Sequence, residues 1–379
     1  MKPTVCISGL GHIGLPMATL LTTVGYQIHG VDTNEEIISK IQSGKIPFYD
    51  PELESLLKNH PFEISNKPIR SDIHIIAVPT PLGPDRFADL SYVHQAIDAI
   101  GKVLRKEDLV LIESTCPIGT TRNIAKKFPY NLVAYCPERV LPGNLLYELI
   151  HNDRVVGGVD PSSTEKAVSF YRSFTKGNVF RATAEMAEGV KLAENAYRDV
   201  NLAFANELSM ISDQVGLDVN ELIHLANKHP RVNILNPGVG VGGHCIAVDP
   251  WFLVQGAPKH GTLISHAREI NDKKSTWVLD KIRCAIKEKK AQRVACLGLT
   301  YKANVTDLRK SPALAIAKAL ENEVEVLTVD PFVEKTYSIE EGIQKADIIA
   351  VLVPHDAFRL IPQTLFEKKV LLDFVGVFA

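Results

Sequence analysis

The chain has 379 residues, of which 45% are hydrophobic and 23% are charged, and its formal net charge is −2. These values are ordinary for a globular protein of two or three domains. The near-neutral charge offers no polybasic surface for nucleic acid or anionic lipid, and no apolar run reaches the length of a membrane span. Small-molecule partners are therefore favoured.

The start of the chain, Met1 to Val5, enters a strand-like run without the regions of a signal peptide. Six cysteines occur without a Cys-x-x-Cys pair or a close Cys/His ligand set. We therefore expect a cytoplasmic protein with reduced thiols and no metal site.

Short β-rich runs alternate with helical patterns in the first half of the chain. Such alternation predicts a parallel sheet with helices on both faces, in an N-terminal Rossmann domain of residues 1–182. The predicted strands are Thr4 to Leu10, Gln27 to Asp32, Asp72 to Val78, Leu109 to Glu113, Leu132 to Tyr135 and Val155 to Val159.

Glycines follow the first predicted strand in the pattern Gly-x-Gly-x-x-Gly, at Gly9, Gly11 and Gly14. Between a strand and a helix, this pattern is typical of dinucleotide binding, because it lets pyrophosphate approach the helix N-terminus. Asp32 ends the second strand, where a carboxylate accepts from ribose hydroxyls. Since no arginine follows it directly, we expect NAD rather than NADP.

Two hydroxyls follow further strands of the same sheet, at Thr80 and Thr115. We expect both to reach the cofactor or a reaction water, although a hydroxyl at a strand end equally often caps the next turn. The loop Pro79 to Leu90 is unusually long and follows a strand at the edge where α/β sheets bind ligands.

The pattern changes to long helices between Thr183 and Lys228, which predicts a central helical domain of residues 183–290. Lys191, Asn195 and Arg198 share one helix face there, at spacing i, i+4 and i+7. Charges on a helix are more often a solvated surface, but this face can hold an oxyanion and a diphosphate. Lys191 is a candidate for moving a proton or stabilising an alkoxide.

The run Gly240 to Pro250 sets Cys245 among glycines and places Asp249 four positions later. Glycines let backbone N–H groups point at anionic atoms, and a thiol beside such groups is stabilised as its anion. We expect Cys245 to be a reactive nucleophile. Buried packing positions are expected for the other cysteines, Cys6, Cys116, Cys136, Cys284 and Cys296.

Strand and helix alternation resumes at Gln292, which predicts a shorter C-terminal domain of residues 291–379. Its predicted strands are Val294 to Leu299, Val324 to Val329, Ile348 to Val353 and Val370 to Asp373, around a helix from Ser311 to Glu323. The expected fold is α/β, with two doubly wound Rossmann-like domains joined by a central helical domain.

The turn at Gly298 lacks the other two fingerprint glycines, so the C-terminal domain is expected to hold a nucleotide through Lys302 and Arg309 rather than a second dinucleotide. Other anion-binding candidates are His229, Arg231 and Tyr301. For each basic residue taken alone, simple exposure to solvent is the alternative.

With these residues in place, the chain resembles the UDP-glucose/GDP-mannose dehydrogenase family over nearly its whole length. The motifs appear in the family's order: the glycine fingerprint, Glu113-Ser114-Thr115, Pro137-Glu138, Lys191 to Asn195, Gly242-Gly243-x-Cys245 to Asp249, and Thr306-Asp307-x-Arg309. Residues 137–143, 197–201 and 243–252 look like the branch that oxidises UDP-N-acetyl-D-mannosamine.

The resemblance implies oxidation of a sugar C6 alcohol to a carboxylate with two NAD⁺ and no release of the aldehyde. It implies that Cys245 forms a thiohemiacetal and then a thioester. Lys191 would donate and accept the proton, with Asn195 as its oxyanion partner. The water that hydrolyses the thioester would be positioned by Asp249, Thr115 and Glu138.

The resemblance also implies two sets of binding residues and a homodimer, across which Arg231 would reach. The NAD contacts would be His12, Ile13, Asp32, Thr80 and Thr115. The UDP-sugar contacts would be Arg139, Val140, Lys191, Asn195, Arg198, His229, Arg231, Gly242, Tyr301, Lys302 and Arg309.

The chain departs from the UDP-glucose enzymes at Pro142, where they carry a glutamate, and at His244, where they carry a small residue. A rival is a UDP-N-acetylglucosamine 6-dehydrogenase, which shares the pattern Pro137-Glu138-Arg139. A non-catalytic NAD or nucleotide-sugar sensor would be expected to have lost its nucleophile or base. A two-electron hydroxyacid dehydrogenase would need neither the thiol nor a second α/β domain.

Overall fold

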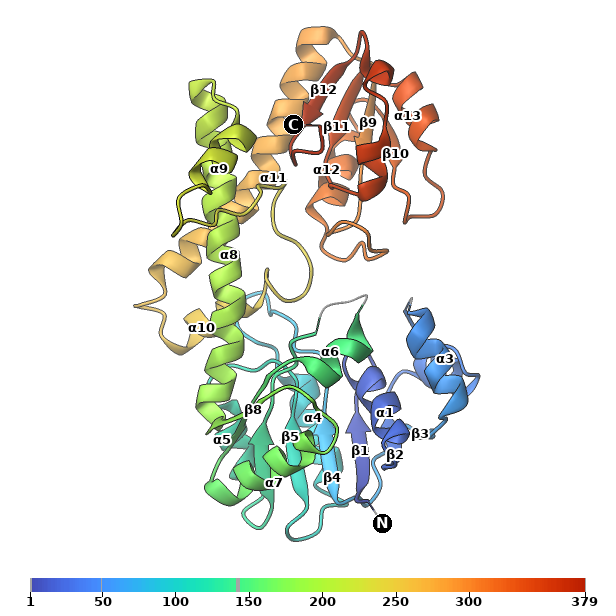
Figure 1. Ribbon diagram of the computed structural model, residues 1–379, viewed down its shortest axis with the longest axis vertical. Helices are drawn as coiled ribbons and strands as arrows, with labels where there is room; N and C mark the ends of the chain where they lie inside the picture. Colours follow the sequence, from blue (N-terminus) through green and yellow to red (C-terminus); the bar gives the residue numbers. More distant parts are fainter. Residues whose placement is uncertain (1, 49, 141–143, 379) are drawn as a thin grey trace. The chain divides into compact units, whose positions relative to one another are not determined.

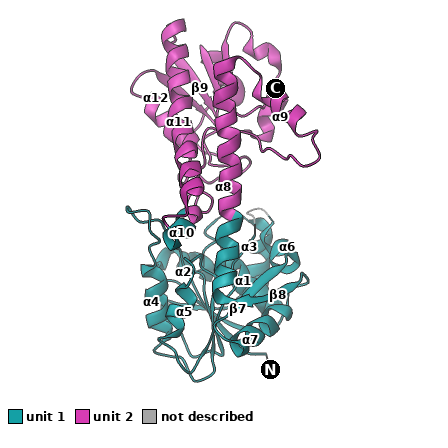
Figure 2. Cartoon of the chain, turned by 90° about the vertical axis from the view of Figure 1, so that its left-hand side faces the viewer, with its two compact units in different colours: residues 1–194, 251–257 teal, residues 195–250, 258–379 magenta. Residues whose placement is uncertain are grey.

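The computed structural model describes residues 2–48, 50–140 and 144–378 (Figure 1). The chain forms two compact units, which Figure 2 shows in different colours: residues 1–194 with 251–257, and residues 195–250 with 258–379. Within the described ranges, no helix combines the length and apolarity needed to cross a membrane.

The first unit contains a sheet of parallel and antiparallel strands. In the described part its strands are β1 (Thr4–Ser8), β2 (Gln27–Val31), β3 (Glu63–Ser65), β4 (Ile73–Ile76), β5 (Leu109–Ile112), β6 (Leu132–Tyr135), β7 (Arg154–Gly158) and β8 (Val179–Thr183). They lie in the order β3-β2-β1-β4-β5-β6-β7-β8. This order reverses between β1 and β4, which is where doubly wound sheets bind ligands.

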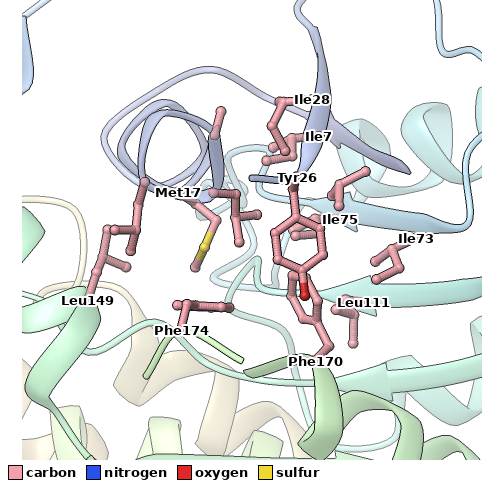
Figure 3. Close-up of a cluster of buried hydrophobic side chains, with 14 of the residues drawn as sticks. Ile7, Met17, Tyr26, Ile28, Ile73, Ile75, Leu111, Leu149, Phe170 and Phe174 are labelled. Atoms are coloured by element: carbon pink, nitrogen blue, oxygen red, sulfur yellow. The ribbon is translucent and has the colours of Figure 1, made fainter. Parts of the chain in front are cut away.

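Helices cover both faces of this sheet. They are α1 (Gly14–Thr23), α2 (Glu35–Gln42), α3 (Pro51–Asn59), α4 (Ser91–Ile100), α5 (Thr120–Ala125), α6 (Leu145–His151) and α7 (Pro161–Arg172). Side chains of α1, α3, α6 and α7 share one buried cluster with the strands, and side chains of α4 and α5 share another. Figure 3 shows part of the first cluster, where the Tyr26 and Phe170 rings meet edge to face at 5.6 Å. The predicted doubly wound arrangement is confirmed.

The prediction of parallel pairing is wrong at β6 and β7, which are antiparallel, with Ala134 opposite Gly158 and Tyr135 opposite Gly157. An apolar run reads the same in either direction, so the sequence pattern carries no strand direction. The leucines of α6 pack into the core, and the chain enters β7 at the edge of the sheet where β6 ends. As a result, Arg154 begins β7 at the ligand-binding edge.

Two strands were not predicted, and both are edge strands. Glu63, at the start of β3, is exposed, and four of the five residues of β8 are exposed or only half-buried. A strand with one side in solvent needs no continuous apolar run. The pattern that revealed the buried strands was therefore absent.

A long helix, α8 (Ala184–Val215), follows β8, and the later helices are α9 (Val219–Ala226), α10 (Asp249–Gly256) and α11 (Thr262–Lys289). The expectation of a buried Cys284 is wrong, because its side chain on α11 is exposed. Val278 and Ile282 occupy the buried face of α11 one turn apart. Cys284 lies off that face.

The second unit contains a parallel sheet in the order β10-β9-β11-β12 across its described strands β9 (Arg293–Leu297), β10 (Glu325–Val329), β11 (Ile348–Val351) and β12 (Val370–Asp373). The elements around it are α12 (Pro312–Leu320), α13 (Ile339–Lys345) and the short 3₁₀ helices η1 (Asp356–Leu360) and η2 (Gln363–Phe366). One buried cluster joins the sheet to α11, α12 and α13. The second Rossmann-like fold is therefore confirmed.

Candidate active site

The turn between β1 and α1 has the geometry of a dinucleotide cradle. Gly9 has φ of +93°, and a Cβ there would lie 2.5 Å from the Ala77 carbonyl oxygen. A Cβ on Gly14 would lie 1.9 Å from the Gly9 carbonyl oxygen, whereas Gly11 faces open space. Both outer glycines are required by close backbone packing, and the middle one leaves room for a pyrophosphate at the start of α1. These residues fit NAD.

Asp32 fixes this turn and remains half-buried at its edge. One oxygen, Oδ2, accepts from the Leu10 N–H at 2.9 Å, and Oδ1 accepts from the Asn34 N–H at 2.9 Å. Of the predicted contacts in the turn, His12 is exposed and stacks on Phe48 at 4.2 Å, and Ile13 precedes α1.

Thr80 and Thr115 follow β4 and β5, and both are half-buried. Across the described residues, neither hydroxyl forms a hydrogen bond, so neither caps a turn. The neighbouring Ser114 hydroxyl instead donates to the Val78 carbonyl oxygen at 2.7 Å, and this bond links the segments that follow β4 and β5. Both threonine hydroxyls are thus available to a ligand.

A buried charged network lies at the same edge of the first unit. The Arg154 guanidinium places Nη1 3.4 Å from Glu138 Oε2, and both side chains are buried. The Tyr171 hydroxyl donates to Glu113 Oε1 at 2.6 Å. Burial, reinforced by the charge of Glu138, raises the pKa of Glu113 to about 7. Two acidic side chains thus lie near one buried cation, and the raised pKa favours the protonated form of Glu113.

Lys191 and Arg139 lie beside Glu138. The Lys191 ammonium donates to the Glu138 carbonyl oxygen at 2.7 Å, so a helix and a strand end meet there. Arg139 is paired with Glu194 and donates to the Asp153 carbonyl oxygen at 3.0 Å. Half-buried Val140 packs against the core of the first unit. Pro142, which distinguishes the chain from UDP-glucose enzymes, lies outside the described residues.

In the second unit, the glycines before Cys245 are explained by packing. Gly243 has φ of +83°, and a Cβ there would lie 2.9 Å from the Tyr301 ring. A Cβ on Gly242 would lie 2.4 Å from the Lys310 carbonyl oxygen. The loop therefore lies directly against the segment that carries Tyr301 and Arg309, and it leaves Cys245 and His244 exposed.

Tyr301 and Arg309 are electrostatic neighbours of Cys245. The pKa of Tyr301 is raised by burial and then by Asp307 and Cys245. Arg309 is ion-paired with Asp307 at 2.7 Å and also interacts with Cys245. A guanidinium beside a thiol stabilises the anionic form.

Asp249 lies one turn after Cys245, because its N–H donates to the Cys245 carbonyl oxygen at 2.8 Å. Asn195 Nδ2 donates to Asp249 Oδ2 at 2.5 Å, and Asp249 is buried. The structure thus brings together a predicted nucleophile, amide and carboxylate from two distant segments of the chain.

The remaining predicted contacts are cationic residues and a histidine at the surface. Arg198, His229, Arg231 and Lys302 are exposed. His229 and Arg231 lie two positions apart after α9, where the Arg231 N–H donates to His229 Nδ1 at 3.3 Å. Within the described residues, no group of three or more His, Cys, Asp and Glu residues could hold a metal ion.

A buried polar network that the sequence analysis missed anchors the start of the cysteine loop. Asp199 pairs with Arg268 at 2.6 Å and accepts from Asn271 at 2.7 Å. Asn271 in turn accepts from Asn206, whose Oδ1 holds the Gly238 N–H at 2.8 Å. Asp199 and Asn206 are seven positions apart on α8, and polar side chains at this helical spacing were the available signal.

The chain matches the models of three domains of one protein family. The NAD binding domain of the UDP-glucose/GDP-mannose dehydrogenase family matches residues 3–175, its central domain matches residues 185–273 and its UDP binding domain matches residues 295–379. These segments contain the glycine turn, the Lys191 and Cys245 segments, and the Tyr301 to Arg309 segment.

Similar proteins have related activities. An NDP-N-acetyl-D-galactosaminuronic acid dehydrogenase from Ralstonia nicotianae is 42% identical, covering 99% of this chain and 96% of the relative. A UDP-N-acetyl-D-mannosamine dehydrogenase from Campylobacter jejuni is also 42% identical, covering 93% and 96%. The structure of the UDP-D-ManNAc dehydrogenase from Pyrococcus horikoshii superposes with a TM-score of 0.92 at 36% identity, covering 99% and 96%. The chain therefore belongs to the UDP-glucose/GDP-mannose dehydrogenase family, whose members carry an NAD-binding and a UDP-binding domain.

Proposed function

We propose that this protein is an NAD-dependent UDP-N-acetyl-D-mannosamine 6-dehydrogenase, which makes the corresponding uronate as a precursor of surface polysaccharide. The observation that carries the proposal is the exposed Cys245 with Asp249 one turn away and Asn195 bonded to that carboxylate at 2.5 Å. A two-electron dehydrogenase needs no nucleophile, whereas oxidation of an aldehyde to an acid proceeds readily through a thioester.

In the proposed reaction, Lys191 takes the proton of the sugar O6, and Asn195 donates to the oxygen as its charge develops. NAD, when bound, accepts a hydride in each of two oxidations, so two NAD are used per sugar. Cys245 attacks the aldehyde carbon to give a thiohemiacetal, which becomes a thioester after the second oxidation. Asp249, Thr115 and Glu138 position the water that releases the acid.

We propose the predicted binding residues as two sets. NAD is held by the glycine turn, His12, Ile13, Asp32, Thr80 and Thr115. Support for this set comes from the open space at Gly11 and from the two threonine hydroxyls, which form no hydrogen bond within the described residues. The sugar nucleotide is held by Arg139, Val140, Lys191, Asn195, Arg198, His229, Arg231, Gly242, Tyr301, Lys302 and Arg309. Support for this set comes from the exposed cations and from the packing of Gly243 on Tyr301.

The identity of the sugar rests on the relatives. The Campylobacter jejuni mannosamine enzyme and the Ralstonia nicotianae galactosaminuronic acid enzyme are equally identical to this chain, at 42%. Likeness to the Pyrococcus horikoshii structure favours N-acetylmannosamine. Oxidation of an N-acetylgalactosamine nucleotide is the second candidate, and the N-acetylglucosamine nucleotide is the third.

We further propose three domains, residues 1–182, 183–290 and 291–379, and a homodimer formed through α8. Tyr197, Phe204 and Ile211 are 71%, 54% and 54% exposed on α8. Because they are seven positions apart, they form one apolar stripe of the kind that pairs helices. Phe204→Glu is expected to yield monomers in light scattering after size exclusion. A monomeric wild type would contradict the dimer.

A cytoplasmic location is also proposed, since NAD and nucleotide sugars are available there and Cys245 must stay reduced to act as a nucleophile. Fractionation of cells that carry a tagged protein, with an assay for NADH formation in each fraction, tests it.

The decisive experiment measures NADH formed per mole of nucleotide sugar. UDP-N-acetylmannosamine, UDP-N-acetylgalactosamine, UDP-N-acetylglucosamine and UDP-glucose are compared on the wild type, Cys245→Ala and the exposed-thiol control Cys284→Ala. About two NADH per mannosamine nucleotide, lost only in Cys245→Ala, is the expected result. Preference for another sugar nucleotide would show that the proposed substrate is wrong while the thioester mechanism stands. NADH from none of the four would favour the non-catalytic sensor.

A further inference from the structure

The two Rossmann-like sheets end their central strands in the same way. In the first, the Gly9 N–H donates to the Val31 carbonyl oxygen at 2.8 Å, and the Leu10 N–H donates to Asp32 at 2.9 Å. In the second, the Gly298 N–H donates to the Val329 carbonyl oxygen at 2.8 Å, and the Leu299 N–H donates to Asp330 at 2.6 Å. Asp330 thus stands where the first sheet has Asp32, the carboxylate that we have proposed as an NAD contact.

The sheets differ at the residue that follows the strand on the other side of the central strand, β4 beside β1 and β11 beside β9. Thr80 follows β4 in the run Val78-Pro79-Thr80, and His355 follows β11 in the run Val353-Pro354-His355, each four positions after the strand ends. Thr80 is half-buried, whereas His355 is 0% exposed. Its Nε2 lies 3.1 Å from Asp330 Oδ2, so the protein's own imidazole covers the carboxylate.

The other side of the imidazole holds the loop that follows β9. The Asn304 N–H donates to His355 Nδ1 at 3.0 Å, so Nδ1 is an acceptor and the ring proton is on Nε2. That proton faces Asp330 and the Thr300 hydroxyl, which is 3.3 Å away. Thr300 in turn donates to the Lys302 carbonyl oxygen at 2.8 Å. One neutral histidine tautomer satisfies every one of these contacts.

The same loop carries Tyr301 and Lys302, which we have proposed as substrate contacts. Beyond the ring, Asn304 Nδ2 donates to Asp356 Oδ2 at 2.7 Å, and the Asp356 N–H donates to Asn304 Oδ1 at 3.2 Å. Hydrogen bonds therefore hold the loop at Thr300 and at Asn304, on either side of Tyr301 and Lys302.

We infer that His355, with Asp330, is a positioning residue for nucleotide binding: it holds residues 300–304 so that Tyr301 and Lys302 meet the uridine diphosphate of the substrate. Four backbone N–H groups reach this pair, those of Leu299, Thr300 and Phe332 on Asp330 and that of Asn304 on His355. Without the imidazole, the Asn304 N–H loses its acceptor, and the loop beyond Lys302 keeps the side-chain bonds between Asn304 and Asp356 but loses its backbone contact with the sheet edge.

The alternative is a histidine that only stabilises the core, where it stacks on Phe332 at 5.1 Å and meets Phe358 edge to face at 5.3 Å. A purely stabilising residue changes the free energy of unfolding but leaves the UDP affinity of the folded protein unchanged. The two roles are therefore separated by measuring ligand affinity and stability in the same variants.

The test uses the full chain with UDP as the probe in isothermal titration calorimetry. His355→Ala is expected to weaken UDP binding about tenfold or more, because a loop that is less ordered in the free protein must be ordered when UDP binds, and this ordering lowers the affinity. His355→Asn is expected to recover most of the affinity, since its Oδ1 replaces Nδ1 as the acceptor for Asn304. NAD affinity and kcat are expected to stay within about twofold of the wild type, while KM for the sugar nucleotide rises with the UDP Kd.

The matched control is Asp347→Ala. Asp347 lies in the same unit and accepts from the Gln292 and Arg293 N–H groups at 2.8 and 2.9 Å, at the start of β9, the opposite end from the loop. UDP affinity that is unchanged in His355→Ala, or weakened equally in both variants, would overturn the inference. The inference rests on the proposed substrate class, but the two fail separately: if UDP binds and no sugar is oxidised, only the proposed activity is lost.

Discussion

The Arg154 guanidinium lies 3.4 Å from the Glu138 carboxylate, and the two side chains are 3% and 6% exposed. They meet because β7 runs antiparallel to β6, which puts the first residue of β7 at the edge where β6 ends. Arg154 Nη2 also donates to the Leu149 carbonyl oxygen at 3.0 Å, which ties α6 to the same point.

Replacing Arg154 by Met is expected to lower the free energy of unfolding by about 3–5 kcal/mol, because it leaves the Glu138 carboxylate buried without its cation. Urea unfolding monitored by circular dichroism measures the change. Arg181→Met is the control, since Arg181 forms an ion pair with Glu165 at the surface, and it is expected to change stability little. Equal effects of the two substitutions would contradict the importance of the buried pair.

Glu113 is expected to make stability depend on pH. Burial and then the charge of Glu138 raise its pKa from an ordinary 4.5 to about 7 in the folded protein. Below about pH 4.5 both the folded and the unfolded state hold the proton, and between 4.5 and 7 only the folded state does. The contribution of Glu113 to the free energy of unfolding is therefore fully present below pH 4.5 and is lost as the pH rises through 7.

Glu113→Gln keeps an acceptor for the Tyr171 hydroxyl and cannot ionise, so it is expected to lack this dependence. Relative to Glu113→Gln, the wild type is expected to lose about 3 kcal/mol of unfolding free energy between pH 4.5 and 7.5. Urea titrations at several pH values check the difference. Parallel pH profiles for the two proteins would show that Glu113 is ionised in the folded state.

Cys245 is expected to be alkylated at least about tenfold faster than Cys284 at pH 7, although both thiols are exposed, because only Cys245 has the Arg309 guanidinium as an electrostatic neighbour. Burial raises the pKa of Cys6 to about 11 and that of Cys136 and Cys296 to about 12, so these thiols are expected to stay unmodified. Iodoacetamide labelling followed by peptide mass spectrometry gives the rates. Equal rates at Cys245 and Cys284 would remove the case for an activated nucleophile.

Gly243→Ala is expected to lower the unfolding free energy by about 1–3 kcal/mol and to raise KM for the sugar nucleotide. The substitution forces a side chain into left-handed backbone, with its Cβ against the Tyr301 ring. Gly256→Ala is the control, because a Cβ at Gly256 meets nothing within 4 Å. Thermal unfolding and initial rates are compared, and a Gly243→Ala variant as stable and active as Gly256→Ala would be the contrary outcome.

The sequence by itself determined the fold class and the chemistry of single residues. Buried strands of a doubly wound sheet are apolar over their whole length, and the glycine pattern before α1 follows from close backbone contacts at Gly9 and Gly14. The spacing of Cys245 and Asp249 is local, so the sequence also determined that these two residues lie one helical turn apart. Each of these features depends on neighbours along the chain.

Only the tertiary structure decided which distant residues meet. Strand direction is not encoded in an apolar run, so the antiparallel β7 and the Arg154–Glu138 pair could not be predicted. His355 and Asp330 are 25 positions apart, and their pairing depends on β10 and β11 lying on either side of β9. The physical reason is the same in both cases: burial and partner choice are properties of packed elements, and residue type and local spacing do not specify them.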